Sequence, residues 1–234
     1  MKKFILAFIT LFIMTSVSLA DSNVYITQSG AALDLDITLD GNANAVGASN
    51  DRTLLTGANL DVDIDLIGAT NTITGDFIGA GESGSDDLKI SQTGSTNTTA
   101  LNVGASAATD DVDIIETRVG SSGETSYIIG SAATVQDVSV TVDVIGDDID
   151  IAITENSSSS GSDKTTDIDI GTDSDDVDII ITHTGAGAHK TKLLCTGSCA
   201  GSDFTMSQTG ANSTDVDLTV TNATSSDVDI TITD

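Results

Sequence analysis

The sequence contains no proline and no tryptophan, and aromatic residues make up only 3% of its 234 residues. Disorder-prone segments are usually rich in proline, so the absence of proline argues against a disordered linker. Aromatic side chains normally fill globular cores and line ligand pockets, so their shortage argues against both. The chain therefore needs an architecture that small and β-branched residues can fill.

Basic residues are scarce as well, with 8 Lys and Arg against 36 Asp and Glu, for a formal net charge of -28. A face that binds nucleic acid needs clustered Lys and Arg to contact the phosphates. We therefore expect no nucleic-acid partner.

The first 20 residues have the features of a secretory signal peptide. Two lysines at positions 2 and 3 precede an apolar run, Phe4–Met14, and the small residues Ser18 and Ala20 follow it. The run is too short to span a membrane as a helix. We expect cleavage after Ala20, which leaves residues 21–234 as a single exported domain with a net charge of 6 minus 36, or -30.

The two cysteines, Cys195 and Cys199, bracket three small residues. In an oxidising compartment they could close a small turn disulfide. Two ligands do not complete a zinc site, and three intervening residues is not the spacing of a redox pair. We therefore expect a turn disulfide or two free thiols, without metal or redox chemistry.

Aspartate alternating with an aliphatic residue is the most frequent pattern in the chain. Strict two-residue alternation is typical of a β-strand with one buried face, and Val, Ile and Thr favour strands. Short clusters of Gly, Ser, Asn, Thr and Asp separate the runs, as turns require. The runs include Leu33–Ile37, Leu60–Leu66, Asp111–Ile114, Asp148–Ile151, Asp167–Ile170, Asp176–Ile179, Asp215–Leu218 and Asp227–Ile232.

The spacing of these runs indicates a stacked repeat. We count roughly sixteen or seventeen strands, and pairs of strands recur every ~22 to 28 residues, within the range of stacked repeats. A β-sandwich of this size would normally have aromatic core residues and prolines in its loops. We therefore predict an all-β fold, a β-solenoid of about 7–8 rungs whose strand-turn-strand repeats stack about 4.8 Å apart. The absence of proline agrees, because stacked strands donate backbone hydrogen bonds to their neighbours.

Three strands end in a glutamine that is followed two residues later by glycine, and these phrases resemble curlin repeats, the units of bacterial curli fibres. The curlin pattern places serine, glutamine, glycine and asparagine at fixed spacing, and Ser22 and Ser202 match its first position. The other matching residues are Gln28 and Gly30, then Gln92, Gly94 and Asn97, then Gln208 and Gly210, with a partial copy at Gly68 and Asn71.

The resemblance implies a secreted fibre subunit that passes through the periplasm and assembles at the cell surface with copies of itself or with related subunits. It also implies partners in outer-membrane export and nucleation machinery. Stacked Gln and Asn side chains would form hydrogen-bonded ladders between rungs. The glycines would supply the positive φ that tight turns need.

Aspartates stacked one rung apart repel each other, by roughly 0.9 kcal/mol per pair at ~4.8 Å in water. They form either a solvated face or a set of carboxylates that binds divalent cations weakly, since Ca²⁺ accepts such ligands. We favour the solvated face and expect no cofactor beyond weakly bound Ca²⁺. The candidate ligands are Asp61, Asp63, Asp111, Asp113, Asp176 and Asp178.

We expect no enzymatic activity. His183 lies in a variant of the Gln-x-Gly phrase, so a turn or ladder role is expected for it and for His189, the other histidine. No phosphate loop or nucleophile elbow is present. Three functions stay open. We favour a self-assembling fibre for adhesion and biofilm; the alternatives are a monomeric acidic adhesin or divalent-cation-binding protein, and an ice-binding solenoid.

Overall fold

The computed structural model describes residues 21–29, 32–47, 52–57, 59–79, 86–104, 109–130, 135–156, 163–171, 174–196, 199–210, 213–221 and 225–233. The described residues form strands and turns, and none of them belongs to a helix that could cross a membrane. The expected signal peptide and Gly30 lie outside the described residues.

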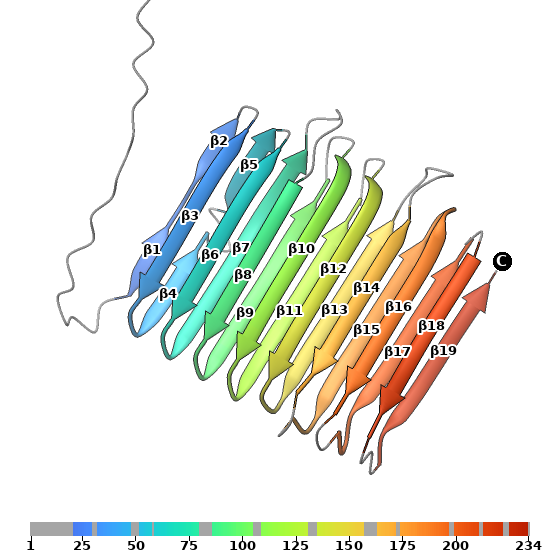
Figure 1. Ribbon diagram of the computed structural model, residues 1–234. Coiled ribbons are helices and arrows are strands. Elements are labelled where there is room, and N and C mark those ends of the chain that lie inside the picture. The colour runs from blue at the N-terminus through green and yellow to red at the C-terminus, as the bar shows by residue number, and fades with distance from the viewer. Residues whose placement is uncertain are drawn as a thin grey trace, which may run out of the picture.

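Nineteen strands follow one another along the described residues (Figure 1). In β6 (Leu60–Ile67) the aliphatic residues Leu60, Val62 and Ile64 are buried, whereas Asp61 and Asp63 face solvent, as two-residue alternation predicts. The other strands are β1 (Ser22–Val24), β2 (Thr27–Ser29), β3 (Leu33–Asp40), β4 (Ala43–Val46), β5 (Thr53–Gly57), β7 (Thr70–Gly79), β8 (Asp86–Thr93), β9 (Thr96–Val103), β10 (Thr109–Val119), β11 (Ser122–Ile129), β12 (Val135–Ile145), β13 (Ile149–Asn156), β14 (Lys164–Ile170), β15 (Val177–Thr184), β16 (Ala188–Cys195), β17 (Asp203–Thr209), β18 (Ser213–Val220) and β19 (Asp227–Thr233).

The strands form two parallel sheets, and the chain winds alternately through them. Sheet A has 11 strands, in the order β1-β4-β7-β9-β11-β13-β15-β17-β19, with β2 beside β5 and β5 beside β7. Sheet B has 8 strands, in the order β18-β16-β14-β12-β10-β8-β6-β3. Each strand pairs with the strand one full turn away, as Val112 of β10 does with Val138 of β12. The predicted β-solenoid is confirmed.

We call each strand position across a sheet a row, and sheet A has one row more than sheet B. β1 and β2 pair with β4 and β5, and β4 and β5 pair with successive parts of β7, so each of these short pairs occupies one row. The 11 strands of sheet A therefore make nine rows, which is 11 minus 2, against 8 in sheet B. The 8 rows of sheet B agree closely with the predicted rungs.

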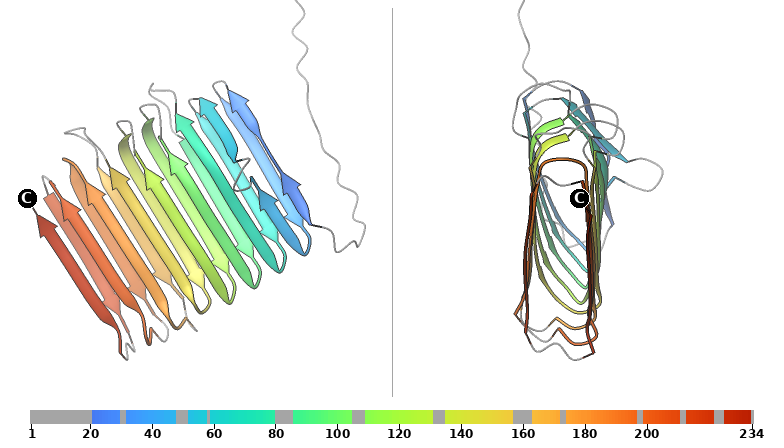
Figure 2. Two further views of the ribbon diagram at one scale, coloured as in Figure 1. Left: turned by 180° about the vertical axis from the view of Figure 1, so that it is seen from behind. Right: turned by 90° about the vertical axis from the view of Figure 1, so that its right-hand side faces the viewer.

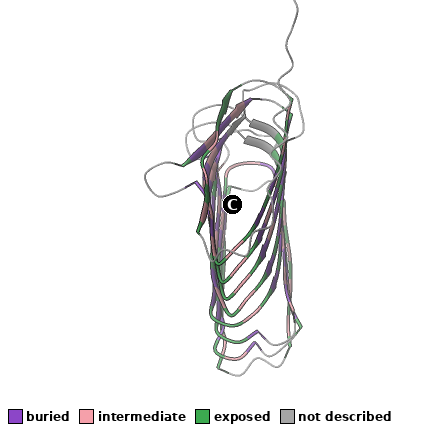
Figure 3. Ribbon diagram, turned by 90° about the vertical axis from the view of Figure 1, so that its left-hand side faces the viewer, coloured by how far each residue is buried: buried purple, intermediate pink, exposed green. Residues whose placement is uncertain are grey.

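The core is a thin layer between the two sheets, which lie face to face in the end-on view (Figure 2). Buried and exposed positions alternate along the strands (Figure 3). Because pairing is parallel and in register, inward side chains of successive rungs form columns. One column of sheet B contains Leu35, Val62, Leu88, Ile114 and Val140. Aliphatic side chains fill most of this core, and its buried aromatic residues are Phe77, Tyr127 and Phe204.

The shortest turns change ends partway along the solenoid. From β6 to β13 they lead from sheet B to sheet A, as residues 94–95 do between β8 and β9. Later they lead from sheet A to sheet B, as residues 185–187 do between β15 and β16. Strands within a sheet are parallel, so these two kinds of turn lie at opposite ends of the rungs.

Candidate functional site

Glycines form a column at the short turns from sheet B to sheet A. The Gly68 N–H donates to the Thr93 carbonyl at 2.9 Å, and the Gly94 N–H donates to the Val119 carbonyl at 3.0 Å. A Cβ on Gly94 would overlap the Gly68 carbonyl oxygen, so the turn has room only for glycine. From the sequence, we expected these turns to need glycine because of a positive φ. Gly68 and Gly94 do not have a positive φ, whereas Gly210 has a φ of 79°.

A ladder of buried asparagines runs beside this glycine column. Asn44 Nδ2 donates to Asn71 Oδ1 at 3.0 Å, and Asn71 Nδ2 donates to Asn97 Oδ1 at 2.9 Å. The same amides also donate to turn carbonyls, for example Asn71 to Thr93 at 3.1 Å. The structure thus brings Asn71 and Asn97 together and adds Asn44. Their separations of 27 and 26 residues are the sequence signal that could have identified Asn44.

The ladder stops where Gly123 follows Asn97 in the column. The guanidinium of Arg118 fills the space that a side chain would need, because a Cβ on Gly123 would lie 2.9 Å from Arg118 Cζ. Arg118 is buried, and its Nη1 donates to Thr125 Oγ1 at 2.8 Å. A buried cation thus replaces the next amide of the ladder.

Glu116 lies close to Arg118 and forms the centre of what we call the Glu116 cluster. Its carboxylate accepts hydrogen bonds from Thr99 Oγ1 at 2.8 Å, from Thr125 Oγ1 at 2.9 Å and from the Tyr127 hydroxyl at 2.9 Å. Burial lowers the pKa of Arg118, although Glu116 opposes this effect. Burial and the nearby Glu116 raise the pKa of Tyr127 well above its usual value, so the phenol stays protonated and donates.

The three glutamines expected to form a ladder do not stack on one another. Gln92 is buried in sheet B between Leu66 and Arg118, and its Nε2 donates to the Thr98 carbonyl at 3.3 Å. Gln28 and Gln208 lie in sheet A. Their phrases precede turns from sheet A to sheet B, whereas the Gln92 phrase precedes a turn in the opposite direction. The repeated phrase therefore occurs at both ends of the rungs.

A second buried polar group, which we call the Glu155 cluster, lies in β13 to β17. Glu155 Oε2 is 3.3 Å from His183 Nε2. Thr166 Oγ1 donates to Glu155 Oε1 at 3.1 Å and lies 2.9 Å from His183 Nε2. Gln208 Nε2 lies 3.3 Å from His183 Nδ1 and donates to Thr191 Oγ1 at 3.0 Å. His183 and Gln208 therefore serve as internal hydrogen-bonding groups.

Two further ionisable groups, Lys164 and His189, complete the Glu155 cluster. Lys164 Nζ lies 3.5 Å from His189 Nε2, and the His189 ring meets the His183 ring edge to face with centroids 5.4 Å apart. Burial lowers the pKa of both Lys164 and His189. The cluster thus gathers one carboxyl, two imidazoles and one amine inside the core.

The pKa values of Glu155 and His183 define the charge state of their contact. Burial raises the pKa of Glu155 to about 8, against the opposing effects of Thr166 and Lys164. Burial lowers the pKa of His183 to about 3, and the nearby His189 and Lys164 act in the same direction. Near neutral pH the contact therefore joins a neutral carboxyl to a neutral imidazole and is not an ion pair.

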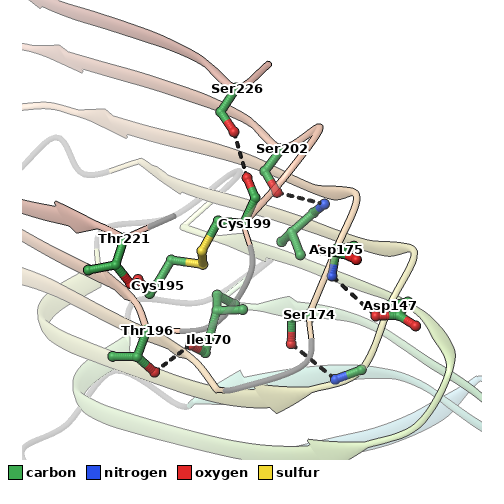
Figure 4. The surroundings of a disulfide bond; sticks show 12 residues. Asp147, Ile170, Ser174, Asp175, Cys195, Thr196, Cys199, Ser202, Thr221 and Ser226 are labelled. Atoms are coloured by element: carbon green, nitrogen blue, oxygen red, sulfur yellow. Dashed lines mark hydrogen bonds between the residues drawn. A yellow bond between two sulfur atoms is a disulfide. The ribbon is translucent and has the colours of Figure 1, made fainter. Parts of the chain in front are cut away.

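A disulfide joins Cys195 and Cys199 across the turn from β16 to β17, and both residues are buried (Figure 4). Hydrogen bonds tie this turn to the next rung. The Thr221 hydroxyl donates to the Cys195 carbonyl at 2.9 Å, and the Ser226 hydroxyl donates to the Cys199 carbonyl at 2.5 Å. Of the two states left open by the sequence, the structure has the disulfide, which closes one turn of the core.

Acidic residues stack in columns on the outer faces. Burial and the neighbouring Asp203 and Asp150 raise the pKa of Asp178. Among the described residues, no group of three or more His, Cys, Asp or Glu side chains is arranged to hold a metal ion. One column contains Asp34, Asp61, Asp87 and Asp113, and another contains Glu124, Asp150, Asp178, Asp203 and Asp227.

The remaining cation candidates do not join these two columns. Asp63 stacks on Asp36 in a neighbouring column of sheet B. Asp111 and Asp176 have positive φ, 54° and 56°. The six proposed ligands are therefore spread over several columns and both sheets. The choice between a solvated acidic face and weak cation binding stays a prediction.

The last row of each sheet exposes apolar side chains and a strand edge. β18 and β19 end their sheets and have no outer neighbour among the described strands. Val228, Ile230 and Ile232 of β19 are 41%, 45% and 48% exposed. An open groove between the two strands is lined in part by Leu218 and Met206. Exposed edges of this kind are templates for another strand, so this end is the candidate assembly interface.

Comparison of the chain with protein-family models, with curated proteins and with solved structures found no match. The resemblance to curlin repeats stays a prediction from the repeat phrases. The function therefore has to be inferred from the rungs and their exposed ends.

Proposed function

We propose that this chain is a secreted structural subunit that stacks end to end with copies of itself into fibres at the cell surface, in the extracellular matrix, adhesion or biofilm. The observation that carries the proposal is the exposed apolar last row, β18 and β19. The repeat phrases that resemble curlin repeats support the same class of protein. Export and nucleation partners belong to this proposal.

The two ends of the solenoid present matching columns. In sheet A, successive register pairs put Val228 in the same column as Val24. In sheet B, they put Val216 and Leu218 in the columns of Leu35 and Ile37. A second copy could therefore extend the sheets at the spacing of about 4.8 Å with apolar side chains on apolar side chains.

The acidic columns set a condition on this assembly. A copy stacked in register extends columns that contain consecutive carboxylates, and the whole chain carries a net charge of -28. Salt screens such repulsion because the Debye length falls to about 8 Å at physiological ionic strength. Assembly should therefore be faster at moderate salt than at low salt, with divalent cations acting by screening.

The test is to incubate purified residues 21–234 with salt and to examine the product by electron microscopy and fibre diffraction. We expect fibres with a reflection near ~4.8 Å. Ile230→Lys, which places a charge in the exposed last row, should slow fibre growth by about tenfold or more. Ile180→Lys is the matched control, because Ile180 is 53% exposed on an inner row of the same sheet. Monomers that persist at high concentration with salt and calcium would reject the proposal and favour the monomeric adhesin.

A further inference from the structure

The difference of one row between the sheets limits how two copies can join. Sheet A has nine rows and sheet B has 8. If the β1–β2 row of a second copy stacked on β19, sheet A would continue but sheet B would lack one row between β18 and the next β3. If β1 and β2 left their row, β4 and β5 would stack on β19 and β3 on β18. Both sheets would then continue without a gap.

Resting on the end-to-end assembly proposed above, we propose that β19 of one copy displaces β1 and β2 of the next and that β18 pairs with β3. The interface is then β18 and β19 on one side and β3, β4 and β5 on the other. A missing row would leave the facing backbone groups of β18 and β3 unpaired along a whole strand. Displacement avoids this loss and gives a continuous fibre.

The displaced row has the shortest strands of sheet A. β1 and β2 have 3 residues each, and β2 is exposed along its whole length. β19 has 7 residues in one uninterrupted strand. An incoming β19 therefore replaces two short pieces by a continuous strand that can pair along the whole row.

The incoming strand also fits the columns better. Val228 would take the place of Val24, which preserves an apolar contact. Ile232 would take the place of Gln28 above Leu55, because the Leu55 column reaches Ile232 at the far end. Leu55 is fully buried, so an aliphatic neighbour suits it better than an amide.

On the outer faces, the same junction brings few like charges together. Asp227 would lie beside Ala45 in sheet A, with no like charge opposite it. In sheet B, Asp215 would lie beside Asp34 and Asp217 beside Asp36. These are like pairs of the kind that Asp34–Asp61 and Asp36–Asp63 already form within the chain. The junction therefore adds no arrangement that the solenoid does not already contain.

Cross-linking between mixed copies tests the register directly. Copies with Asp227→Cys are co-assembled with copies carrying Ala45→Cys, or with copies carrying Asn23→Cys. Adjacent rows lie about 4.8 Å apart and two rows about 9.6 Å, and a disulfide needs a Cα separation of roughly 4.4–6.8 Å. We expect dimers on non-reducing gels from the Ala45→Cys mixture only, with wild-type fibres as background. Dimers from the Asn23→Cys mixture instead would overturn the displacement.

A locked row gives an independent test. Asn23 and Ala45 are register partners, so the double variant Asn23→Cys/Ala45→Cys can tie β1 to β4 within one copy. The control Ala100→Cys/Ser126→Cys ties β9 to β11, which stay paired in any junction. We expect the first lock to slow elongation by about tenfold or more until it is reduced, and the control lock to leave the rate unchanged.

Locked copies that elongate at the wild-type rate would refute the displacement while leaving fibre formation intact. Wild-type protein that never forms fibres would refute the proposed function itself. The two failures are therefore distinguishable.

Discussion

Replacing Glu155 by glutamine should change how the stability of the solenoid depends on pH. Glu155 is buried, and its pKa of about 8 compares with 4.5 for an ordinary glutamate. Between these two values the folded protein holds a proton that the unfolded chain has released. Stability must therefore fall as pH rises from 4.5 to about 8 and level off above that value. The glutamine variant keeps a neutral side chain of similar shape and lacks this decline.

The magnitude follows from the same two pKa values. One pKa unit corresponds to about 1.4 kcal/mol, so the interval from 4.5 to about 8 is worth about 5 kcal/mol. His183 acts in the opposite sense, because its pKa of about 3 makes stability rise from pH 3 to 6.5. That contribution is present in both proteins and cancels in the comparison. Lys164 and His189 are likewise retained in the variant.

The assay is urea unfolding of monomeric wild type and variant at a series of pH values from 4.5 to 9. We expect the unfolding free energy of the variant, relative to that of the wild type, to increase by about 5 kcal/mol in total as pH rises to about 8. Glu124→Gln on the neighbouring β11 is the control, since it makes the same substitution at an exposed position. Parallel pH curves for wild type and Glu155→Gln would show that Glu155 is ionised in the folded protein and would refute the reasoning.

Four variants test the turns. Gly94→Ala should cost about 3 kcal/mol or more in unfolding free energy because its Cβ overlaps a neighbouring carbonyl, whereas Ser95→Ala in the same exposed turn should cost under ~0.5 kcal/mol. Asn71→Ala should cost about 2–4 kcal/mol, because it leaves ladder amides and turn carbonyls unpaired, and urea unfolding would measure this. Cys195→Ala with Cys199→Ala should cost about 2 kcal/mol, as a short disulfide loop predicts, and an unchanged urea midpoint would contradict it.

The fold could be predicted because its determinants are local. In Leu60–Leu66 the alternation assigns each side chain to the core or to solvent, and repetition of such runs along the chain leaves stacking as the simplest way to bury the apolar face. The shortage of aromatic residues then limits the core to a thin layer. The register of the strand pairs could not be predicted from the sequence, because the shift between neighbouring rungs depends on turns of unequal length.

The buried polar clusters were missed although the sequence contained a signal for them. In β10 the inward phase set by Val112 and Ile114 continues to Glu116 and Arg118, so both charged residues fall on the apolar side of the alternation. A charge in that phase indicates a buried, hydrogen-bonded group. The hydrogen-bond partners of Glu116 could not be inferred in the same way, because Thr125 and Tyr127 lie in the opposite sheet.

The glutamine phrases show why a repeated motif does not define a column. Gln92 and Gln208 occupy similar phrases, yet Gln92 lies in sheet B and Gln208 in sheet A, because the short turns change ends between them. A strand followed by glutamine and glycine therefore specifies a turn, and the number of strands before it decides the sheet. The Glu155 cluster, in the strands around this change, contains Gln208 and His183 at equivalent positions of successive rungs. Each rung contacts only its neighbours, so the change of turn is accommodated locally and the columns on either side continue.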